Sequence, residues 1–500
     1  MTEDRTPAAA DNPEGAGIEE GQEEQPIKGR KNGLYSEVSD ELAASMKSGW
    51  ADTELRDLRP VEQAPYAARR RAALSAAFPG ERIIVPAGNL RTRSNDTEYS
   101  FRAASEYVHL TGDQSEDAVL VLEPRDGGHT ETIYLLPRSN RENGEFWLDG
   151  HGELWVGRRN SLAEAEQLLG LAARDVRKAA EELAAADPAV PTRIVRGYDA
   201  GLEAAVEAFT SAERDEQLKT FLSGLRLVKD DWEIGQLRAA CSSTVNGFTD
   251  VVRELGQAVA TSERWIEGTF WRRARVEGND IGYGSICAAG PHATTLHWVR
   301  NDGDVRPGEL LLLDAGVETH TLYTADVTRT LPINGGFSPL QRRIYDAVYE
   351  AQEAGIAAVK PGARFRDFHD AAQRVLAEHL LAWGLLDPAV YDVEKVLELG
   401  LQRRWTLHGT GHMLGLDVHD CAQARREDYV DALLEPGMCL TVEPGLYFQQ
   451  DDLTVPEEYR GIGVRIEDDI LVTADGNENL SAALPRRAEE VEAWMAGLTA

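Results

Sequence analysis

The sequence contains few cysteines, no long apolar run and far fewer positive than negative charges. Its four cysteines are dispersed among 500 residues without a CxxC pair: Cys241, Cys287, Cys421 and Cys439. This pattern argues against a disulfide scaffold and a thiolate metal cluster, so we expect four reduced thiols in a cytoplasmic protein. Because no stretch of about 18 apolar residues occurs, we expect no membrane-spanning helix. The N-terminus also lacks the apolar segment of a secretory signal.

The charge balance bears on possible partners. Lys and Arg number 52 against 85 Asp and Glu, which gives a formal net charge of -33. Such a chain repels phosphate backbones and anionic lipid, so we expect neither nucleic acid nor a membrane as a partner. The sequence also contains no nucleophile-elbow motif and no glycine-rich phosphate loop. Bound cations would cancel part of the negative charge.

The length predicts two domains and a tail, because 500 residues exceed one ordinary core. Residues 1–33 lack aromatics and are rich in Glu, Gly, Pro and Ala, which predicts a disordered acidic tail. Residues 34–230 alternate between helical and strand patterns and predict an α/β domain with a supporting role. Within it we expect helices at 60–78 and 161–186 and strands at 81–88, 117–124 and 131–138.

The second predicted domain, residues 231–500, contains a weak internal repeat. A helix is expected at 229–255, and another from Ser338 to Pro361, with Pro339 in its first turn. Two Pro-Gly pairs are each followed by an apolar strand, an acidic residue seven positions after the Pro, and a Gly two positions later. The two acids are Asp314 and Glu443. The repeat predicts two halves that face each other across one site.

Acidic residues occur at or near the strand ends of both halves. Asp314 ends one apolar strand and Asp326 begins the next, so a hairpin would bring these two carboxylates together. In the other half, Glu443 ends a strand and Glu467 lies within another. Unpaired carboxylates at apolar strand ends are costly, and a bound cation would compensate them. The neighbouring Asp468 and Asp469 are expected to be an ordinary polar strand end.

Three histidines lie between the halves in a glycine-rich segment, at His408, His412 and His419. Four carboxylates and one imidazole form a hard ligand set, which favours two divalent ions such as Mn²⁺, with Co²⁺ or Zn²⁺ as alternatives. Two such ions about 3.5–4 Å apart hold a bridging hydroxide and polarise a carbonyl, so they hydrolyse an amide without a Ser or Cys nucleophile. Each of these residues alone would be read as an ordinary exposed acid or histidine. The acids, the histidines and the repeat together predict a metal site.

At these residues the sequence resembles the pita-bread metallopeptidases, and among them the Xaa-Pro aminopeptidases. The matching segments span the second domain: TTLHW (294–298), LLDAG (312–316), ADVTRT (325–330), HGTGHMLGLDVHD (408–420), LTVEPGLY (440–447) and YRGIGVRIEDDI (459–470). More loosely, EYSFRAASEYVHLTG (98–112) and GELWVGRR (152–159) resemble that family's creatinase-type N-terminal domain. The resemblance implies an α/β (α+β) fold with a C-terminal pita-bread domain that carries a pseudo-two-fold repeat.

The resemblance also implies residue roles. Asp314 would bind one metal, Asp326 and Glu467 would bridge both, and His412 and Glu443 would complete the other. Around them, His297, His408 and His419 would bind substrate, stabilise the oxyanion or move protons, with Glu443 as a proton shuttle. Tyr447 would line a proline pocket, and Arg465 would orient Glu467 or shape that pocket. Trp155 would approach the site of a neighbouring subunit in a homodimer or homotetramer. The segment at 421–433 does not align, so neither Arg425 nor Arg426 is assigned.

The expected activity is release of the N-terminal residue from peptides with proline second. A prolidase, which cleaves only Xaa-Pro dipeptides, shares these ligands and is the nearest alternative. A methionine aminopeptidase would not need the large N-terminal domain, and a creatinase would lack the metal ligands. A non-catalytic peptide-binding protein of the same fold is a further alternative, although such proteins usually lose ligands and this chain keeps all five.

Overall fold

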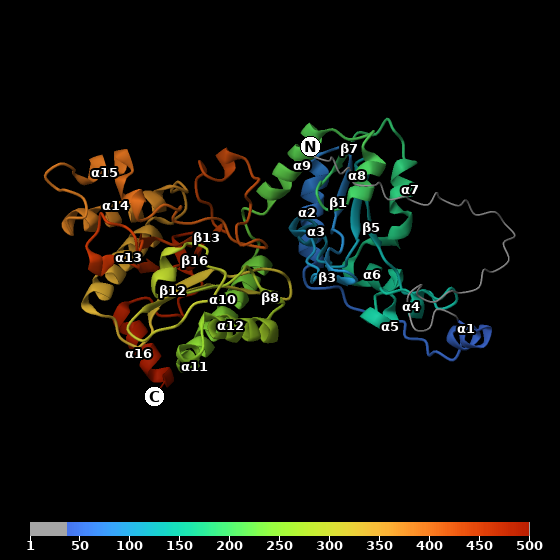
Figure 1. The fold of residues 1–500 in the computed structure, drawn as a ribbon. Coiled ribbons are helices and arrows are strands. Elements are labelled where there is room, and N and C mark those ends of the chain that lie inside the picture. Colours follow the sequence, from blue (N-terminus) through green and yellow to red (C-terminus); the bar gives the residue numbers. More distant parts are fainter. Residues whose placement is uncertain (1–37, 500) are drawn as a thin grey trace, which may run out of the picture. The chain divides into compact units, whose positions relative to one another are not determined.

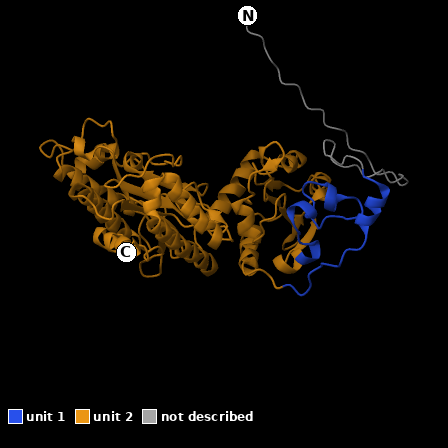
Figure 2. Ribbon diagram, turned by 60° about the horizontal axis from the view of Figure 1, so that its bottom comes forward, with its two compact units in different colours: residues 1–58, 137–164 blue, residues 59–136, 165–500 orange. Residues whose placement is uncertain are grey.

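The computed structural model describes residues 38–499 (Figure 1). The predicted acidic tail, residues 1–33, lies outside the described residues. The described part of the chain divides into two compact units (Figure 2), one formed by residues 38–58 and 137–164 and the other by residues 59–136 and 165–499. None of the helices in the described part is both long and apolar enough to cross a membrane.

The smaller unit is built from short helices, namely α1 (Asp40–Lys47), α4 (Glu145–Leu148) and α5 (Glu153–Val156). Its aromatic centre is the edge-to-face pair of Trp50 and Phe146, with ring centroids 5.3 Å apart, and the Arg141 guanidinium lies over both rings. Helix α5 exposes Leu154, Trp155 and Val156 to solvent.

The larger unit begins with a five-stranded sheet in the order β6-β5-β4-β1-β7. Its strands are β1 (Arg82–Pro86), β4 (Val119–Arg125), β5 (Gly128–Leu135), β6 (Ala172–Asp175) and β7 (Thr192–Ile194). Pairing is antiparallel in the centre, and β6 and β7 join the two edges in parallel. The helices of this region are α2 (Ala64–Ala77), α3 (Ser105–Thr111), α7 (Ala179–Ala184), α8 (Ala200–Val206) and α9 (Ala212–Leu225). A small hairpin of β2 (Thr92–Ser94) and β3 (Thr97–Glu98) precedes α3.

One predicted helix of this region is wrong. The segment 161–186 is split into α6 (Leu162–Leu169), strand β6 and helix α7. Gly170, with φ of +66°, ends α6 in the left-handed region that favours glycine. The alanine-rich composition favours helix, but parallel pairing with β5 supplies β6 with backbone hydrogen bonds.

The rest of the larger unit surrounds the predicted site with helices. These are α10 (Asp231–Arg253), α11 (Leu255–Ala260), α12 (Glu263–Glu277), α13 (Pro339–Ala358), α14 (Asp367–Ala382), α15 (Val393–Leu399) and α16 (Ala488–Thr499). The predicted start of α13 is confirmed: Ser338 caps it, Gln341 completes a capping box and Pro339 occupies the first turn. Helices α10 and α12 approach closely at Gly247, where an added Cβ would lie 2.5 Å from the Phe270 ring.

Two small sheets form the predicted halves of the repeat. One has the order β12-β10-β9 and the other β13-β16-β17, with β14-β15 and β11-β8 as flanking pairs. Their strands are β8 (Asp280–Ile281), β9 (Ile286–Ala289), β10 (Leu310–Ala315), β11 (Val317–Glu318), β12 (Val327–Pro332), β13 (Cys439–Val442), β14 (Gly445–Phe448), β15 (Ile462–Arg465), β16 (Asp468–Val472) and β17 (Asn477–Asn479). Strands β10 and β12 pair antiparallel, as do β13 and β16.

Hydrogen bonds between β12 and the segment that includes β15 join the two halves. The Thr330 hydroxyl donates to the Arg465 carbonyl at 2.9 Å, and the Glu467 amide donates to the Thr328 carbonyl at 3.0 Å. These bonds bring the carboxylates of both halves to one place. The glutamate predicted to lie within a strand instead occupies the break between β15 and β16.

Candidate metal centre

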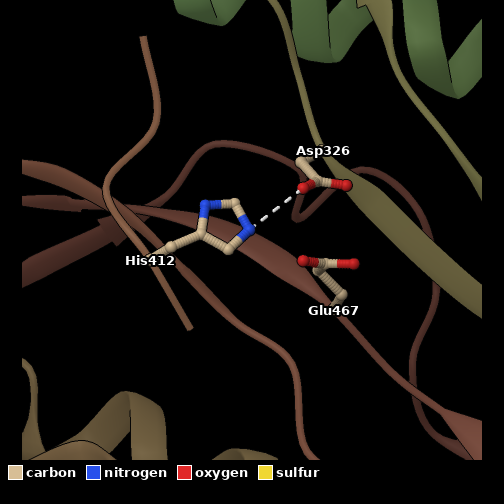
Figure 3. A group of neighbouring side chains, drawn as sticks. All are labelled: Asp326, His412 and Glu467. Carbon is tan, nitrogen blue, oxygen red and sulfur yellow. Dashed lines mark ion pairs between the residues drawn. The ribbon is translucent and has the colours of Figure 1, made fainter. Parts of the chain in front are cut away.

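The five predicted ligands meet in one cavity of about 660 Å³. Each comes from a strand end or from a loop between strands: Asp314 from β10, Asp326 just before β12, His412 from the glycine-rich loop, Glu443 between β13 and β14, and Glu467 between β15 and β16. Figure 3 shows three of them converging from separate segments. One ligand atom each of Asp326, His412 and Glu467 lies within 4.8 Å of the others.

His412 faces two carboxylates through one ring nitrogen. Its Nε2 lies 3.3 Å from Asp326 Oδ2 and 3.6 Å from Glu443 Oε1, and its Nδ1 lies 3.1 Å from the Met413 carbonyl. Hydrogen bonding of Nδ1–H to that carbonyl leaves the Nε2 lone pair to bind a metal. Burial lowers the pKa of His412, but the two carboxylates outweigh burial and raise it to about 9. A bound cation would displace that proton.

The carboxylates lie close together in a buried site, and their surroundings show whether these residues suit a metal ion. Burial, together with the neighbouring acids, raises the pKa of Glu467 well above its usual range and that of Glu443 to about 7. Glu467 Oε2 accepts a hydrogen bond from the Thr328 hydroxyl at 2.7 Å, whereas the buried Oε1 has no partner among the described residues. A buried carboxylate oxygen without a hydrogen-bond partner, surrounded by other acids, is what a bound cation would satisfy, so the residues fit a metal.

Arg465 pairs with Asp314 and not with Glu467. Its Nη2 donates to Asp314 Oδ2 at 2.5 Å, its Nη1 donates to the Tyr447 hydroxyl at 2.9 Å, and its Nε donates to the Thr328 hydroxyl at 3.2 Å. The buried guanidinium therefore fixes one predicted ligand and the predicted pocket tyrosine in a single geometry. Arg465 makes no direct hydrogen bond to Glu467, but the Thr328 hydroxyl that accepts from Arg465 donates to Glu467 Oε2. Both predicted roles of Arg465, orienting Glu467 or shaping the pocket, therefore stay predictions.

Sequence patterns missed Tyr283. Its hydroxyl lies 2.7 Å from Asp314 Oδ1 and 2.5 Å from Asp326 Oδ1, and it lines the same cavity. Burial and the adjacent carboxylates raise the pKa of Tyr283 well above its usual range, so the hydroxyl keeps its proton. It stands in a segment with no periodic pattern, and no sequence signal would have found it.

The acids after Glu467 are not a polar strand end. Asp468 and Asp469 are fully buried on β16. Asp469 accepts the backbone N–H of Asp326 at 3.2 Å, and Asp468 pairs with the equally buried Arg329 at 2.7 Å. The expectation of solvation is wrong, because both acids hold the adjacent half of the site.

The three other predicted histidines differ in their surroundings. His408 Nε2 contacts the Tyr447 hydroxyl at 2.8 Å, and burial with the nearby Arg465 lowers the pKa of His408 to about 4. It is therefore neutral at pH 7. His297 and His419 both line the cavity and expose their rings to it. The His419 ring lies edge-on to that of His412, with centroids 4.3 Å apart.

The remaining predicted or unassigned residues do not line this cavity. Trp155 lies on α5 of the smaller unit and is 58% exposed. Arg425 pairs with Asp428 and lines a separate cavity of about 1090 Å³, and Arg426 pairs with Asp431.

Two family models match the chain. Residues 235–474 match metallopeptidase family M24, and residues 66–189 match the aminopeptidase P N-terminal domain. Xaa-Pro aminopeptidase 1 of Streptomyces coelicolor is 72% identical over 97% of this chain and 98% of its own length. Xaa-Pro aminopeptidase of Escherichia coli is 33% identical over 87% of this chain and 98% of its own length.

Solved structures are similar over most of the chain. A glutamate-to-alanine variant of Escherichia coli aminopeptidase P in complex with substrate has a TM-score of 0.77 and 31% identity, covering 88% of this chain and 99% of that chain. A zinc-substituted form of that enzyme in complex with product has a TM-score of 0.77 and 32% identity, covering 89% of this chain and 100% of that chain.

Proposed function

Since the chain belongs to metallopeptidase family M24, and within it to the Xaa-Pro aminopeptidases, we propose that its five clustered ligands hold two divalent ions. The fold is the expected pita-bread domain preceded by an aminopeptidase P N-terminal domain. The chain is a metal-dependent hydrolase that releases the N-terminal residue from peptides with proline second. The observation that carries the metal proposal is the buried cluster of four carboxylates and one imidazole, with an orphaned oxygen on Glu467.

The resemblance to the family implies ligand roles that the mutual positions of the side chains support. Asp314, held by Arg465, would hold the first ion, and His412 and Glu443 would hold the second. Asp326 and Glu467 would be shared by both ions. The contact of Asp326 with both Tyr283 and His412 supports its central place.

When bound, the two ions would polarise the scissile carbonyl and lower the pKa of a water molecule. The chain's own residues orient substrate and move protons around them. Glu443 lines the same cavity as the three histidines, and we propose that it takes a proton there. The His408 Nδ1–H, 3.7 Å from Glu443, already donates to the Gly409 carbonyl at 2.6 Å, so that nitrogen does not receive the proton. His297 and His419 face the same cavity, and we propose that they bind substrate and stabilise the oxyanion.

Proline specificity follows from how the substrate amide is recognised. An Xaa-Pro bond has no N–H on proline, so an enzyme that reads that N–H handles it poorly. We propose that Tyr447, held by Arg465 and His408, shapes a proline pocket that contacts the ring instead. The names of the similar proteins favour an aminopeptidase over the prolidase alternative.

Three finer assignments are proposals of the same kind. We propose Mn²⁺ as the metal because four of the five ligands supply hard oxygen atoms, with Co²⁺ or Zn²⁺ as alternatives. We also propose a cytoplasmic homodimer or homotetramer. In it, Trp155 of one copy would approach the site of another, a role that its exposure supports.

A peptide panel tests the proposal. Xaa-Pro-Yaa tripeptides, matched peptides without proline, and Xaa-Pro dipeptides would be assayed after chelator dialysis and after return of Mn²⁺. We expect cleavage only of the proline tripeptides and only with metal. Full activity in metal-free protein would overturn the two-ion proposal, and faster cleavage of dipeptides would identify a prolidase.

A further inference from the structure

His419 owes its position to the turn that carries it. Its side chain makes no hydrogen bond to any described residue, although it faces the cavity. The surrounding turn, residues 415–420, is compact: a Cβ added at Gly415 would lie 2.2 Å from Asp420 Oδ2. The Asp420 amide donates to the Met413 carbonyl at 2.9 Å. The contacts that hold residues 415–420 in place therefore also orient the His419 imidazole.

The outer side of the turn is held by residues of the N-terminal domain. Arg102 Nη2 donates to the Leu416 carbonyl at 2.6 Å, and its Nε donates to Glu318 Oε2 at 2.7 Å. The Ser105 hydroxyl donates to Asp417 Oδ1 at 2.5 Å, and Arg102 Nη1 lies 3.7 Å from the same oxygen. Arg102 thus ties the turn to β11, and Ser105 adds a second contact three residues along.

The inner side of the turn is held by the segment between α9 and α10. Arg226 Nε donates to Asp420 Oδ1 at 2.9 Å, and Lys229 Nζ donates to Asp420 Oδ2 at 3.2 Å. All three side chains are buried, so these contacts belong to the folding core. Arg102 is different, because 35% of its side chain remains exposed. Its removal is therefore the gentler perturbation.

We propose that Arg102 is a positioning residue for His419, so that the N-terminal domain sets the catalytic rate of the neighbouring domain within the same chain. The inference rests on the proposed role of His419 in the cavity. Arg102 touches no ligand of the metal site in the structure; it acts through the backbone of Leu416 and the side chain of Asp417.

The test compares Arg102→Ala and Arg102→Lys with the unmodified chain, each loaded with Mn²⁺ and assayed on an Xaa-Pro-Yaa peptide. A shift of about 1 Å in a catalytic group costs on the order of 100-fold, so we expect kcat of Arg102→Ala to fall about 10- to 100-fold. KM and the two ions per chain should stay unchanged. Lysine keeps the positive charge but has only one donor nitrogen, so Arg102→Lys should restore part of the rate.

Arg196→Ala is the matched control. Arg196 lies in the same domain, its side chain is 33% exposed, and it pairs with Asp215 at 2.6 Å without contacting the turn. Its loss should leave kcat unchanged. If Arg102→Ala and Arg196→Ala behave alike, Arg102 does not position His419.

A double-mutant cycle separates positioning from general damage. In a His419→Ala background, Arg102→Ala should cost less than about twofold, because no imidazole remains to be aimed. Equal losses in both backgrounds would overturn the proposal, as would loss of metal in Arg102→Ala. Hydrogen exchange gives a second measure: amides of residues 415–420 should exchange faster in Arg102→Ala, and unchanged exchange would refute the mechanism. An unmodified enzyme inactive on proline peptides would instead refute the proposed function.

Discussion

One buried carboxylate organises the loop that carries His297, and its replacement gives a sharp prediction. Glu263, in the first turn of α12, is fully buried. Its Oε1 accepts the Ala289 amide and faces His292 Nδ1, each at 2.8 Å. Its Oε2 accepts the Trp298 indole N–H and the Gly303 amide, again at 2.8 Å. The loop from 290 to 303 is thus gathered around a single side chain.

The cost of Glu263→Gln follows from these four contacts. The glutamine side chain keeps one oxygen, so its NH₂ group must replace an oxygen that faced two donors. If the NH₂ group takes the place of Oε1, it can donate to His292 once the imidazole has changed tautomer. The Ala289 N–H, however, then has no acceptor. An unpaired buried donor costs about 1–3 kcal/mol, and loss of the charge weakens each of the two bonds to the retained oxygen, from Trp298 and Gly303, by about 1 kcal/mol. The total is about 3–5 kcal/mol.

Hydrogen exchange by mass spectrometry would measure this cost locally. A free-energy loss of about 3 kcal/mol corresponds to more than 100-fold faster opening, so peptides covering 289–303 should exchange about 100-fold faster. Because the loop carries His297, we also expect kcat to fall about tenfold while metal content is kept.

The matched control lies one helical turn away. Glu267 is half-buried and accepts one hydrogen bond, from Asn301 Nδ2 at 3.0 Å, which a glutamine oxygen can also accept. Glu267→Gln should therefore be nearly neutral. Unchanged exchange and unchanged kcat in Glu263→Gln would show that the carboxylate does not organise this loop.

Three further predictions concern the site and the fold. Asp326→Asn removes the carboxylate proposed to be shared by both ions, so dialysed protein should lose both ions by elemental analysis; a variant that retains two ions would contradict the ligand assignment. Tyr283→Phe removes a hydroxyl that contacts two ligand carboxylates, so activity titrated with Mn²⁺ should need about 10- to 100-fold more metal; an unchanged titration curve would mean the hydroxyl is dispensable. Burial alone would raise the pKa of Glu233, but His109 and Arg70 outweigh it and lower the pKa to about 2. A depressed pKa contributes stability above pH 4.5 that is lost as pH falls toward 2, so the deficit of Glu233→Gln in urea unfolding should shrink over that range; a constant deficit would contradict this.

The sequence predicted the parts of the site whose signal is local. An apolar strand that ends in an acid is visible in a short window, and its repetition at Asp314 and Glu443 predicted two facing halves. The structure gathers both acids in one cavity with the other three predicted ligands. The start of α13 was predictable for the same reason, since Ser338, Pro339 and Gln341 are neighbours in sequence.

The missed features depend on partners far away in the chain. Asp469 looked like a solvated strand end, but it accepts the amide of Asp326, 143 residues earlier. Tyr283 is one polar residue in a segment without periodicity, and only the folded hairpin brings it to two acids. The prediction of a helix at strand β6 was wrong for the same reason: its alanines favour a helix, and only the pairing with β5 makes the segment a strand. Local patterns cannot report such pairings.

The charge of the assembled site explains why two ions suit it better than one. Four carboxylates against the Arg465 guanidinium leave a formal charge of -3 in a largely buried place. One divalent ion would leave -1, which repels any anion that approaches. Two would bring the residues and ions together to +1, and to zero once a hydroxide is bound, so the negative charge developing on a scissile carbonyl oxygen would not be repelled. Arg465 contributes to this balance because its guanidinium, paired with Asp314, already neutralises one of the four carboxylates. Two divalent ions are then enough to neutralise the other three.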